Sequence, residues 1–185
     1  ALARTAQALR HAHGVDVVLF ADEYPSPDRA RWEKLLDLLI ERDLGQWILL
    51  ETRVPDIVRD AALMDQYRKA GIIHVYVGVE ATDQGTLDRF QKRIRIDESR
   101  EAIRLINSAG MVSETSMVLG MPEDTNDSIE RTLELALEYD PDFAHFLLIA
   151  PWPYAGLHQE LSPYIETTDY AEYNLVSPVA RTKAM

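Results

Sequence analysis

The sequence contains no cysteine. Disulfide bonds, thiolate nucleophiles and cysteine-ligated zinc or iron–sulfur centres are therefore excluded within these 185 residues. Basic residues are also scarce, because 19 Lys and Arg accompany 31 Asp and Glu and leave a formal net charge of −12. Such a charge disfavours nucleic acid and anionic membrane as partners. No apolar run approaches the roughly 18 residues of a transmembrane helix and no signal peptide is visible, so we expect a cytoplasmic protein.

Glycine-rich phosphate loops are missing as well, which argues against a Rossmann domain or an NTPase. The chain does have a repeated alternation of helix and strand patterns, which predicts right-handed βα units and a parallel sheet. The fold class is therefore α/β, either an open sheet or part of a (βα) barrel. The expected strands cover residues 15–23, 46–53, 72–80, 111–120 and 142–150.

Local signals set the expected boundaries. Ser26 should cap the helix after the first visible strand, with Pro27 in its first turn, and one helix should run from about residue 54 to 70. The chain opens on a helix without an initiator methionine, so we expect the barrel strand before that helix to be absent. Residues 1–154 would form this truncated barrel core. The alternation is lost beyond them, and residues 155–185 would form a short helix and an extended tail.

Polar side chains gather toward the ends of the expected strands or along one face. At 72–80, three valines alternate with a second set, namely His74, Tyr76, Gly78 and Glu80. We expect the valines to face the helices and the second set to face the barrel interior. The C-terminal ends of barrel strands carry the active site. The other strands contribute Asp22, Glu23, Glu51, Arg53, Glu114, Ser116, Val118, Gly120 and His145.

Most of these residues also have a structural explanation. Glu51 and Arg53 could form an ion pair at the rim, and Asp22 with Glu23 could begin a polar loop. Single histidines are more often hydrogen-bonded core residues than ligands, and a buried tyrosine more often fills the core. Glu80 is harder to explain in this way, because it ends a strand without another acidic or basic residue, so a site role is favoured.

Two loops have similar alternatives. "GMPEDT" (120–125) combines a flexible glycine with two acids, but it could be a turn whose Asp124 or Thr125 caps the next helix. In "PWPY" (151–154), Trp152 could be a packing anchor or a wall for a flat ligand.

Together these segments resemble the radical S-adenosylmethionine (SAM) superfamily, in its cobalamin-dependent branch. "YVGVEATDQGTLDRFQK" (76–92) is similar to that family's fourth strand and following helix. "EAIRLINSAGMVSETSMVLGMPEDT" (101–125) is similar to its fifth strand and adenine-pocket loop, and "LFADEYPSPDRARW" (19–32) to its second-strand motif. The resemblance implies a partial (βα) TIM-like barrel with about five parallel strands.

Four further segments resemble the anaerobic magnesium-protoporphyrin IX monomethyl ester oxidative cyclases: "ETRVPDIVRD", "YRKAGIIHV", "PWPY" and "DYAEYNLVSPV". This resemblance implies an oxidoreductase that forms the isocyclic ring in bacteriochlorophyll biosynthesis. It also implies a tetrapyrrole substrate, an electron donor, and SAM, a [4Fe–4S] cluster and cobalamin as cofactors of the full-length enzyme. Related branches methylate other substrates or act on hopanoids.

The resemblance further implies residue roles. Glu80 would bind the SAM ribose, Asp22 and Glu23 the SAM ammonium, and Arg53 the SAM carboxylate. Ser116, Val118 and Gly120 would border the adenosine. Glu51 joins this cofactor-binding set, although it stands where we expect an asparagine in the cyclases. Substrate-side candidates are Tyr76, His145, Trp152 and Tyr154, and no residue is assigned to a metal or to the radical step itself.

One departure from the family is large: its Cys-x-x-x-Cys-x-x-Cys cluster loop is absent from this sequence. We therefore expect the chain to begin within the first barrel helix, to be inactive alone, and to self-associate through its exposed edge strand. The rival functions are a hydrolase, lyase or isomerase that uses Asp22, Glu51 and Glu80 as acid–base groups, a metal site around His74 and His145, and a non-catalytic binding module.

Overall fold

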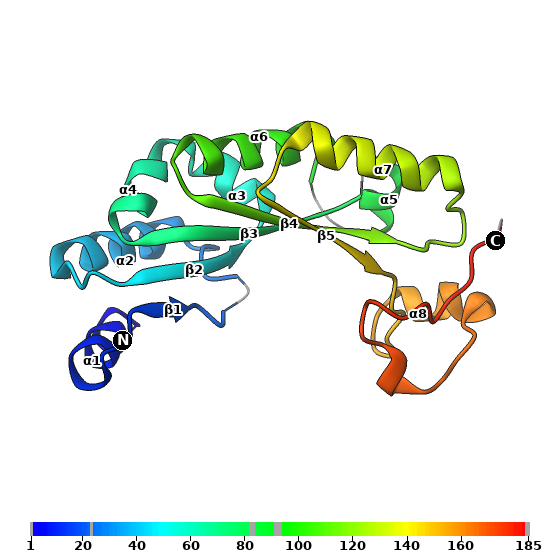
Figure 1. Ribbon diagram of the computed structural model, residues 1–185, viewed down its shortest axis with the longest axis horizontal. Helices are drawn as coiled ribbons and strands as arrows, with labels where there is room; N and C mark the ends of the chain where they lie inside the picture. Colours follow the sequence, from blue (N-terminus) through cyan, green and yellow to red (C-terminus); the bar gives the residue numbers. More distant parts are fainter. Residues whose placement is uncertain (1, 23, 82–83, 91–93, 184–185) are drawn as a thin grey trace. The chain divides into compact units, whose positions relative to one another are not determined.

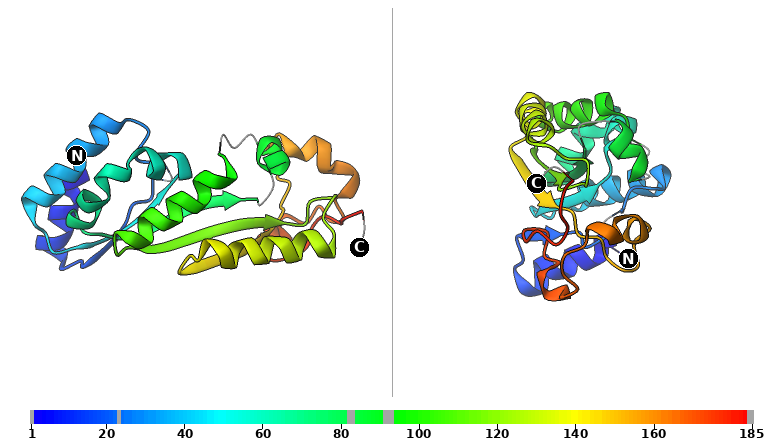
Figure 2. Two further views of the ribbon diagram at one scale, coloured as in Figure 1. Left: turned by 90° about the horizontal axis from the view of Figure 1, so that it is seen from above. Right: turned by 90° about the vertical axis from the view of Figure 1, so that its right-hand side faces the viewer.

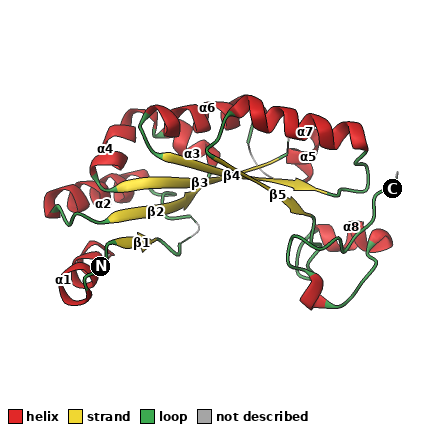
Figure 3. Ribbon diagram, in the orientation of Figure 1, coloured by secondary structure: helices red, strands yellow, loops and turns green. Residues whose placement is uncertain are grey.

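The computed structural model describes residues 2–22, 24–81, 84–90 and 94–183 (Figure 1). Strands and helices alternate along the chain, as Figure 3 shows by colour. The five parallel strands form one sheet in the order β1-β2-β3-β4-β5. The predicted α/β fold with parallel strands of a partial (βα) barrel is thus confirmed. The strands are β1 (Val17–Leu19), β2 (Trp47–Thr52), β3 (Ile72–Glu80), β4 (Val112–Leu119) and β5 (Phe143–Leu148).

The helices fall between these strands and after them. Among the described residues, none of the helices has both the length and the apolar character that a membrane crossing requires. The α-helices are α1 (Leu2–His13), α2 (Arg29–Arg42), α3 (Val54–Arg59), α4 (Met64–Lys69), α5 (Gln84–Arg89), α6 (Ile96–Ser108), α7 (Asn126–Tyr139) and α8 (Leu157–Leu161). Short 3₁₀ helices are η1 (Ala61–Leu63), η2 (Ser162–Tyr164) and η3 (Tyr170–Glu172).

The chain divides into two compact units. The first unit contains the residues up to Gly78 together with Asp97–Thr115 and Pro141–Phe143. The second unit contains Val79–Ile96, Ser116–Asp140 and the residues from Ala144 onward. The boundary crosses β3 between Gly78 and Val79 and crosses β4 between Thr115 and Ser116.

In the first unit, helices cover one face of the strands (Figure 2). β1 pairs with β2 and β2 with β3, both in parallel. On β3, Val75, Val77 and Val79 are fully buried, whereas the alternate residues are half-buried. The predicted alternation along β3 between buried valines and a second, less buried row is thus confirmed. A fully buried core of large side chains lies under the helices, including Trp32, Leu36, Leu50, Ile57, Tyr67 and Ile72.

Two boundary predictions in the first unit are wrong. Asp28, not Ser26, caps α2, because its carboxylate accepts the N–H of Arg31 at 3.1 Å. The helix expected from residue 54 to 70 is divided into α3, η1 and α4. The division occurs at Asp60, whose carbonyl accepts the N–H of Leu63 at 2.7 Å. The carboxylate of Asp60 is buried among polar partners, so tertiary hydrogen bonds override helix continuity there.

In the second unit, α7 begins with a capping box. Thr125 accepts the N–H of Ser128, and the Ser128 hydroxyl accepts the N–H of Thr125. The capping role considered for Thr125 is therefore confirmed. The C-terminal residues return to the strands and loops of this unit: the N–H of Leu148 donates to the carbonyl of Leu175 at 2.7 Å, and the N–H of Lys183 to that of Pro122 at 2.7 Å.

Candidate functional site

Two loops meet where β1 and β2 end in the first unit. Asp22 follows β1, and its carboxylate accepts the N–H of Tyr24 at 3.1 Å. Arg53 follows β2 and precedes α3, and its guanidinium carbon lies 4.0 Å from the centroid of the Tyr24 ring. This distance is that of a cation–π contact. The structure thus brings Asp22 and Arg53 together through Tyr24, whereas Glu23 lies outside the described residues.

A buried polar network lies directly below these loops. The Ser26 hydroxyl is 2.8 Å from the Thr52 hydroxyl and donates to Asp56 Oδ2 at 3.0 Å. Arg59 donates to Asp56 Oδ1 at 2.8 Å and to the backbone carbonyl of Ser26 at 3.0 Å. The buried state of these polar groups is compatible with folding because each has hydrogen-bond partners.

The network continues to the fully buried carboxylate of Asp60. Arg59 donates to both Asp60 oxygens at 2.7 Å, and the Tyr67 hydroxyl donates to Oδ2 at 2.9 Å. The hydrogen bond to Asp60 raises the pKa of the Arg59 guanidinium. Burial, together with the negative charge of Asp60, raises the pKa of the Tyr67 phenol well above its usual value. Tyr67 therefore remains a neutral donor in the folded protein.

Polar side chains on β2, β3 and β4 form a second group of neighbouring residues. Glu51 is the register partner of Tyr76, and His74 Nε2 is hydrogen-bonded to the Glu114 carboxylate. The hydrogen-bonded histidine considered for His74 is therefore observed, although its Nδ1 is buried without a partner. No ion pair joins Glu51 and Arg53 within the part of the chain that the structure describes.

Glu80 ends β3 and lies in the second unit. Its φ of 70° places it in the left-handed region, which is unfavourable for a residue with a side chain. Backbone strain of this kind is concentrated at functional sites, where the surrounding structure holds it. Glu80 thus combines the end of a barrel strand, a carboxylate and a strained backbone.

The loop after β4 is organised around Asp124. Its Oδ2 accepts the N–H groups of Gly120 and Met121 at 2.8 and 2.9 Å, and its Oδ1 accepts the Ser128 hydroxyl at 3.1 Å. Gly120 has a φ of 90°, a conformation that favours glycine. Ser116 is buried and Val118 half-buried on β4, so these predicted residues lead along one strand into this loop.

A set of ion pairs holds the same loop to the C-terminal residues. Glu123 pairs with Lys183 at 2.7 Å and with Arg89 at 2.8 Å, and Arg89 also pairs with Glu160. Lys183 and then Arg89 lower the pKa of Glu123 to about 2. The loop after β4 is therefore fixed both by Asp124 within it and by Lys183 from outside it.

Of the predicted substrate-side residues, Tyr76 lies on β3 in the first unit, whereas the other three lie in the second unit. His145 is exposed on β5. Trp152 stacks on Tyr154 with ring centroids 6.1 Å apart and an angle of 14° between the rings. Trp152 also contacts Tyr173, at 5.2 Å between centroids. Trp152 thus packs against both Tyr154 and Tyr173, and the Tyr154 side chain is exposed.

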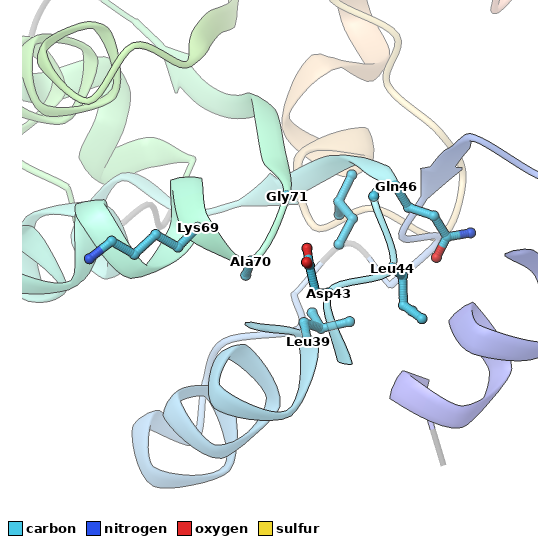
Figure 4. A pocket seen from close by; sticks show the side chains of 9 residues that line it. Leu39, Asp43, Leu44, Gln46, Lys69, Ala70 and Gly71 are labelled. Carbon is cyan, nitrogen blue, oxygen red and sulfur yellow. The ribbon is translucent and has the colours of Figure 1, made fainter. Parts of the chain in front are cut away.

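Two hollows of the first unit lie away from the predicted residues. One of about 70 Å³ is lined by residues that include Asp43, Gln46 and Lys69 (Figure 4). A larger one of about 380 Å³ is formed by residues of α1 and α2. Among the described residues, no group of three or more His, Cys, Asp or Glu side chains could hold a metal ion.

Sequence reasoning missed Tyr24, Asp124 as the organiser of its loop, and the buried Ser26–Thr52–Asp56 contacts. Tyr24 lies inside the motif "LFADEYPSPDRARW", so its place in the motif was a usable signal. No sequence signal separates a buried Ser26 from an N-cap, because both use a serine before an apolar stripe.

The fold is that of a partial (βα) barrel of the radical SAM type, and the family model described as "Radical SAM superfamily" matches residues 1–136. The chain belongs to this superfamily. Among curated proteins, it is 37% identical over 179 residues to the "Anaerobic magnesium-protoporphyrin IX monomethyl ester cyclase" of Rubrivivax gelatinosus, covering 97% of the chain and 32% of the relative. The protein of the same name from Cereibacter sphaeroides is 36% identical over 181 residues, covering 97% and 30%.

The chain thus spans about a third of the length of these relatives. Among solved structures, the radical S-adenosylmethionine methyltransferase TsrM from Kitasatospora setae matches with a TM-score of 0.76 and 15% identity, over 96% of this chain and 37% of that one. Coproporphyrinogen III oxidase from Escherichia coli matches with a TM-score of 0.64 and 18% identity, over 82% and 37%. At these identities the structural likeness concerns the fold alone.

Proposed function

We propose that the chain is the SAM-binding barrel portion of an enzyme that cyclises magnesium-protoporphyrin IX monomethyl ester to form the isocyclic ring. The 37% identity to a cyclase over 97% of the chain carries this proposal. The proposal includes a tetrapyrrole substrate, an electron donor and a cytoplasmic location. When bound, the cluster and SAM would supply, with one electron from the donor, a radical that removes a hydrogen atom from the substrate.

The described residues fit the SAM molecule in kind. A carboxylate such as Glu80 accepts hydrogen bonds from two hydroxyl groups of a ribose better than a neutral acceptor does. Asp22 offers a negative charge for an ammonium, and Arg53 a guanidinium for a carboxylate. The adenine would lie along β4 and the loop after it, bordered by Ser116, Val118 and Gly120. The residues contain no thiolate, so they hold no ligand for the cluster.

The substrate-side proposal concerns Tyr76, His145, Trp152 and Tyr154. The stacked Trp152–Tyr154 pair presents a flat aromatic surface, which suits a planar macrocycle. Tyr76 belongs to the half-buried polar row of β3, and His145 is exposed on β5. Glu51, the register partner of Tyr76, remains in the proposed cofactor-binding set.

The test of SAM binding uses Glu80→Gln, which keeps size and removes the charge. SAM affinity measured by calorimetry should fall about tenfold, in line with a lost charge-assisted hydrogen bond. Glu130→Gln, the same change on the exposed face of α7, is the control and should bind SAM like the wild type. An unchanged SAM affinity of the Glu80 variant would defeat the assignment.

The reaction is tested with the full-length protein after its cluster and cobalamin have been reconstituted. Reductant, SAM and the magnesium porphyrin ester are then added. A product carrying the new ring, identified by mass and absorption spectrum, supports the cyclase. Transfer of a methyl group to an offered acceptor without ring closure would instead place the protein among the methyltransferases.

A further inference from the structure

The loops that carry Tyr24 and Arg53 are joined below the surface by three buried polar side chains. Ser26 lies two residues after Tyr24, and Thr52 lies one residue before Arg53. Their hydroxyl groups are 2.8 Å apart, and both side chains are buried. Asp56 completes the group, which we call the Ser26–Thr52–Asp56 cluster.

Asp56 connects the two loops a second time. Its Oδ2 accepts the Ser26 hydroxyl at 3.0 Å, while its backbone N–H donates to the carbonyl of Arg53 at 3.0 Å. Arg59 then binds both Asp56 Oδ1 and the Ser26 carbonyl, at 2.8 and 3.0 Å. The Ser26 side chain and the backbone of Arg53 are therefore both held by Asp56, the first through its carboxylate and the second through its backbone N–H.

The contact between Arg53 and Tyr24 is too weak to set this geometry alone. A cation–π contact at a solvent-exposed position is weak, and Arg53 is exposed. Buried hydrogen bonds to a carboxylate are stronger, and removing one partner costs more free energy because the other is left buried and unsatisfied. The relative position of the two loops is thus set by the buried cluster.

We infer that the Ser26–Thr52–Asp56 cluster is a positioning device that holds Arg53 and Tyr24 in place to receive the amino-acid end of SAM. This inference rests on the proposed function, because it assigns the SAM carboxylate to Arg53. The three residues of the cluster would not contact SAM themselves. They would act through the two loops that carry Tyr24 and Arg53. The cluster should therefore affect the amino-acid part of the ligand and leave the nucleoside part unaffected.

The test compares two ligands of the full-length protein by calorimetry. S-adenosylhomocysteine carries the amino-acid group, whereas 5′-methylthioadenosine lacks it. Ser26→Ala and Thr52→Val each remove one hydroxyl of the cluster, and each should weaken S-adenosylhomocysteine binding about tenfold. The affinity for 5′-methylthioadenosine should not change. Thr52→Ser restores the hydroxyl and should recover the affinity for S-adenosylhomocysteine.

A matched control removes another buried hydroxyl from the same unit. Ser113 on β4 is fully buried and bonds to Asp142, so Ser113→Ala makes the same chemical change away from the two loops. It should bind both ligands like the wild type. In an Arg53→Met background, Ser26→Ala should have no further effect on S-adenosylhomocysteine, because the positioned group is gone.

The outcomes separate this inference from the proposed function. If both cluster variants bind S-adenosylhomocysteine like the wild type, or lose affinity for both ligands equally, the positioning inference is overturned and SAM binding stands. If the wild type binds neither SAM nor its analogues, the proposed function fails as well. Should Ser26→Ala fail to fold, Thr52→Val decides the question, because valine keeps the shape of threonine.

Discussion

Replacing Tyr67 by phenylalanine should lower the free energy of unfolding of the first unit by about 2 kcal/mol. The Tyr67 hydroxyl donates to Asp60 Oδ2 at 2.9 Å, and both residues are fully buried. A hydrogen bond to a buried charged group contributes about 1.5–3 kcal/mol. Phenylalanine leaves no larger cavity than one oxygen, and Arg59 still binds the carboxylate at 2.7 Å, so the lower part of this range applies.

Trp32 provides the probe for the measurement. It is fully buried, and its ring centroid lies 5.5 Å from that of Tyr67 in an edge-to-face arrangement, so its fluorescence reports unfolding at this position. With a urea dependence of about 2 kcal/mol per molar, the midpoint should fall by roughly 1 M. The unfolding equilibrium constant should rise about thirtyfold.

The control is Tyr154→Phe, which removes the same hydroxyl from a side chain that is 85% exposed. It should change the free energy of unfolding by less than about 0.5 kcal/mol. If Tyr67→Phe is as stable as the wild type with an unchanged urea dependence, the hydrogen bond from Tyr67 to Asp60 does not stabilise the first unit.

The same pair predicts an alkaline dependence. Burial raises the pKa of Tyr67 above the value near 10 that an unfolded chain has. The unfolded state therefore releases this proton first, and the stability contributed below pH 10 declines as pH rises above that value. Tyr67→Phe should remove this decline from the Trp32 unfolding curves.

Three further results are expected. Because Lys183 and Arg89 lower the pKa of Glu123 to about 2, this carboxylate contributes stability above pH 4.5 that is lost as pH falls toward 2. Lys183→Met should raise the pKa of Glu123, which carboxyl NMR can measure. An unchanged pKa would contradict the pairing. Glu80→Gly should remain within about 1 kcal/mol of the wild type in urea unfolding, because glycine tolerates the φ of 70°, yet should bind SAM poorly. At the sheet edge formed by β1, Val17 is exposed, so the 185-residue chain should associate with rising concentration in light scattering, and Val17→Lys should reduce that association; a monomer throughout would overturn the edge-strand prediction.

Much of the fold could be predicted from the sequence because its periodicity is strong. The strand at 72–80 was expected with the bounds that β3 has, since three valines at alternate positions admit one burial pattern. Parallel order followed from the helix between each pair of strands. The break at Asp60 could not be predicted, because an aspartate in a helical pattern does not reveal a distant tyrosine partner.

The candidate site was predictable only in part. Strand ends pointed to Asp22, Arg53 and Glu80, because barrel chemistry gathers there. The contact between Arg53 and Tyr24 was not foreseen, since it joins loops 29 residues apart that no local pattern relates. Asp124 contacts Gly120, Met121 and Ser128, which are all within four residues of it. An aspartate at this position is equally typical of a helix cap, so the sequence could not distinguish a cap from a residue that organises the loop.

The alternation along β3 has a consequence for how the protein can be diversified. Val75, Val77 and Val79 have no exposed surface, so a library randomised at these positions should consist mainly of chains that do not fold. His74, Tyr76 and Gly78 are half-buried on the other face of the strand. A library at those three positions should keep the fold while it samples new ligand preferences. Positions that the fold requires and positions that tolerate change therefore alternate along β3.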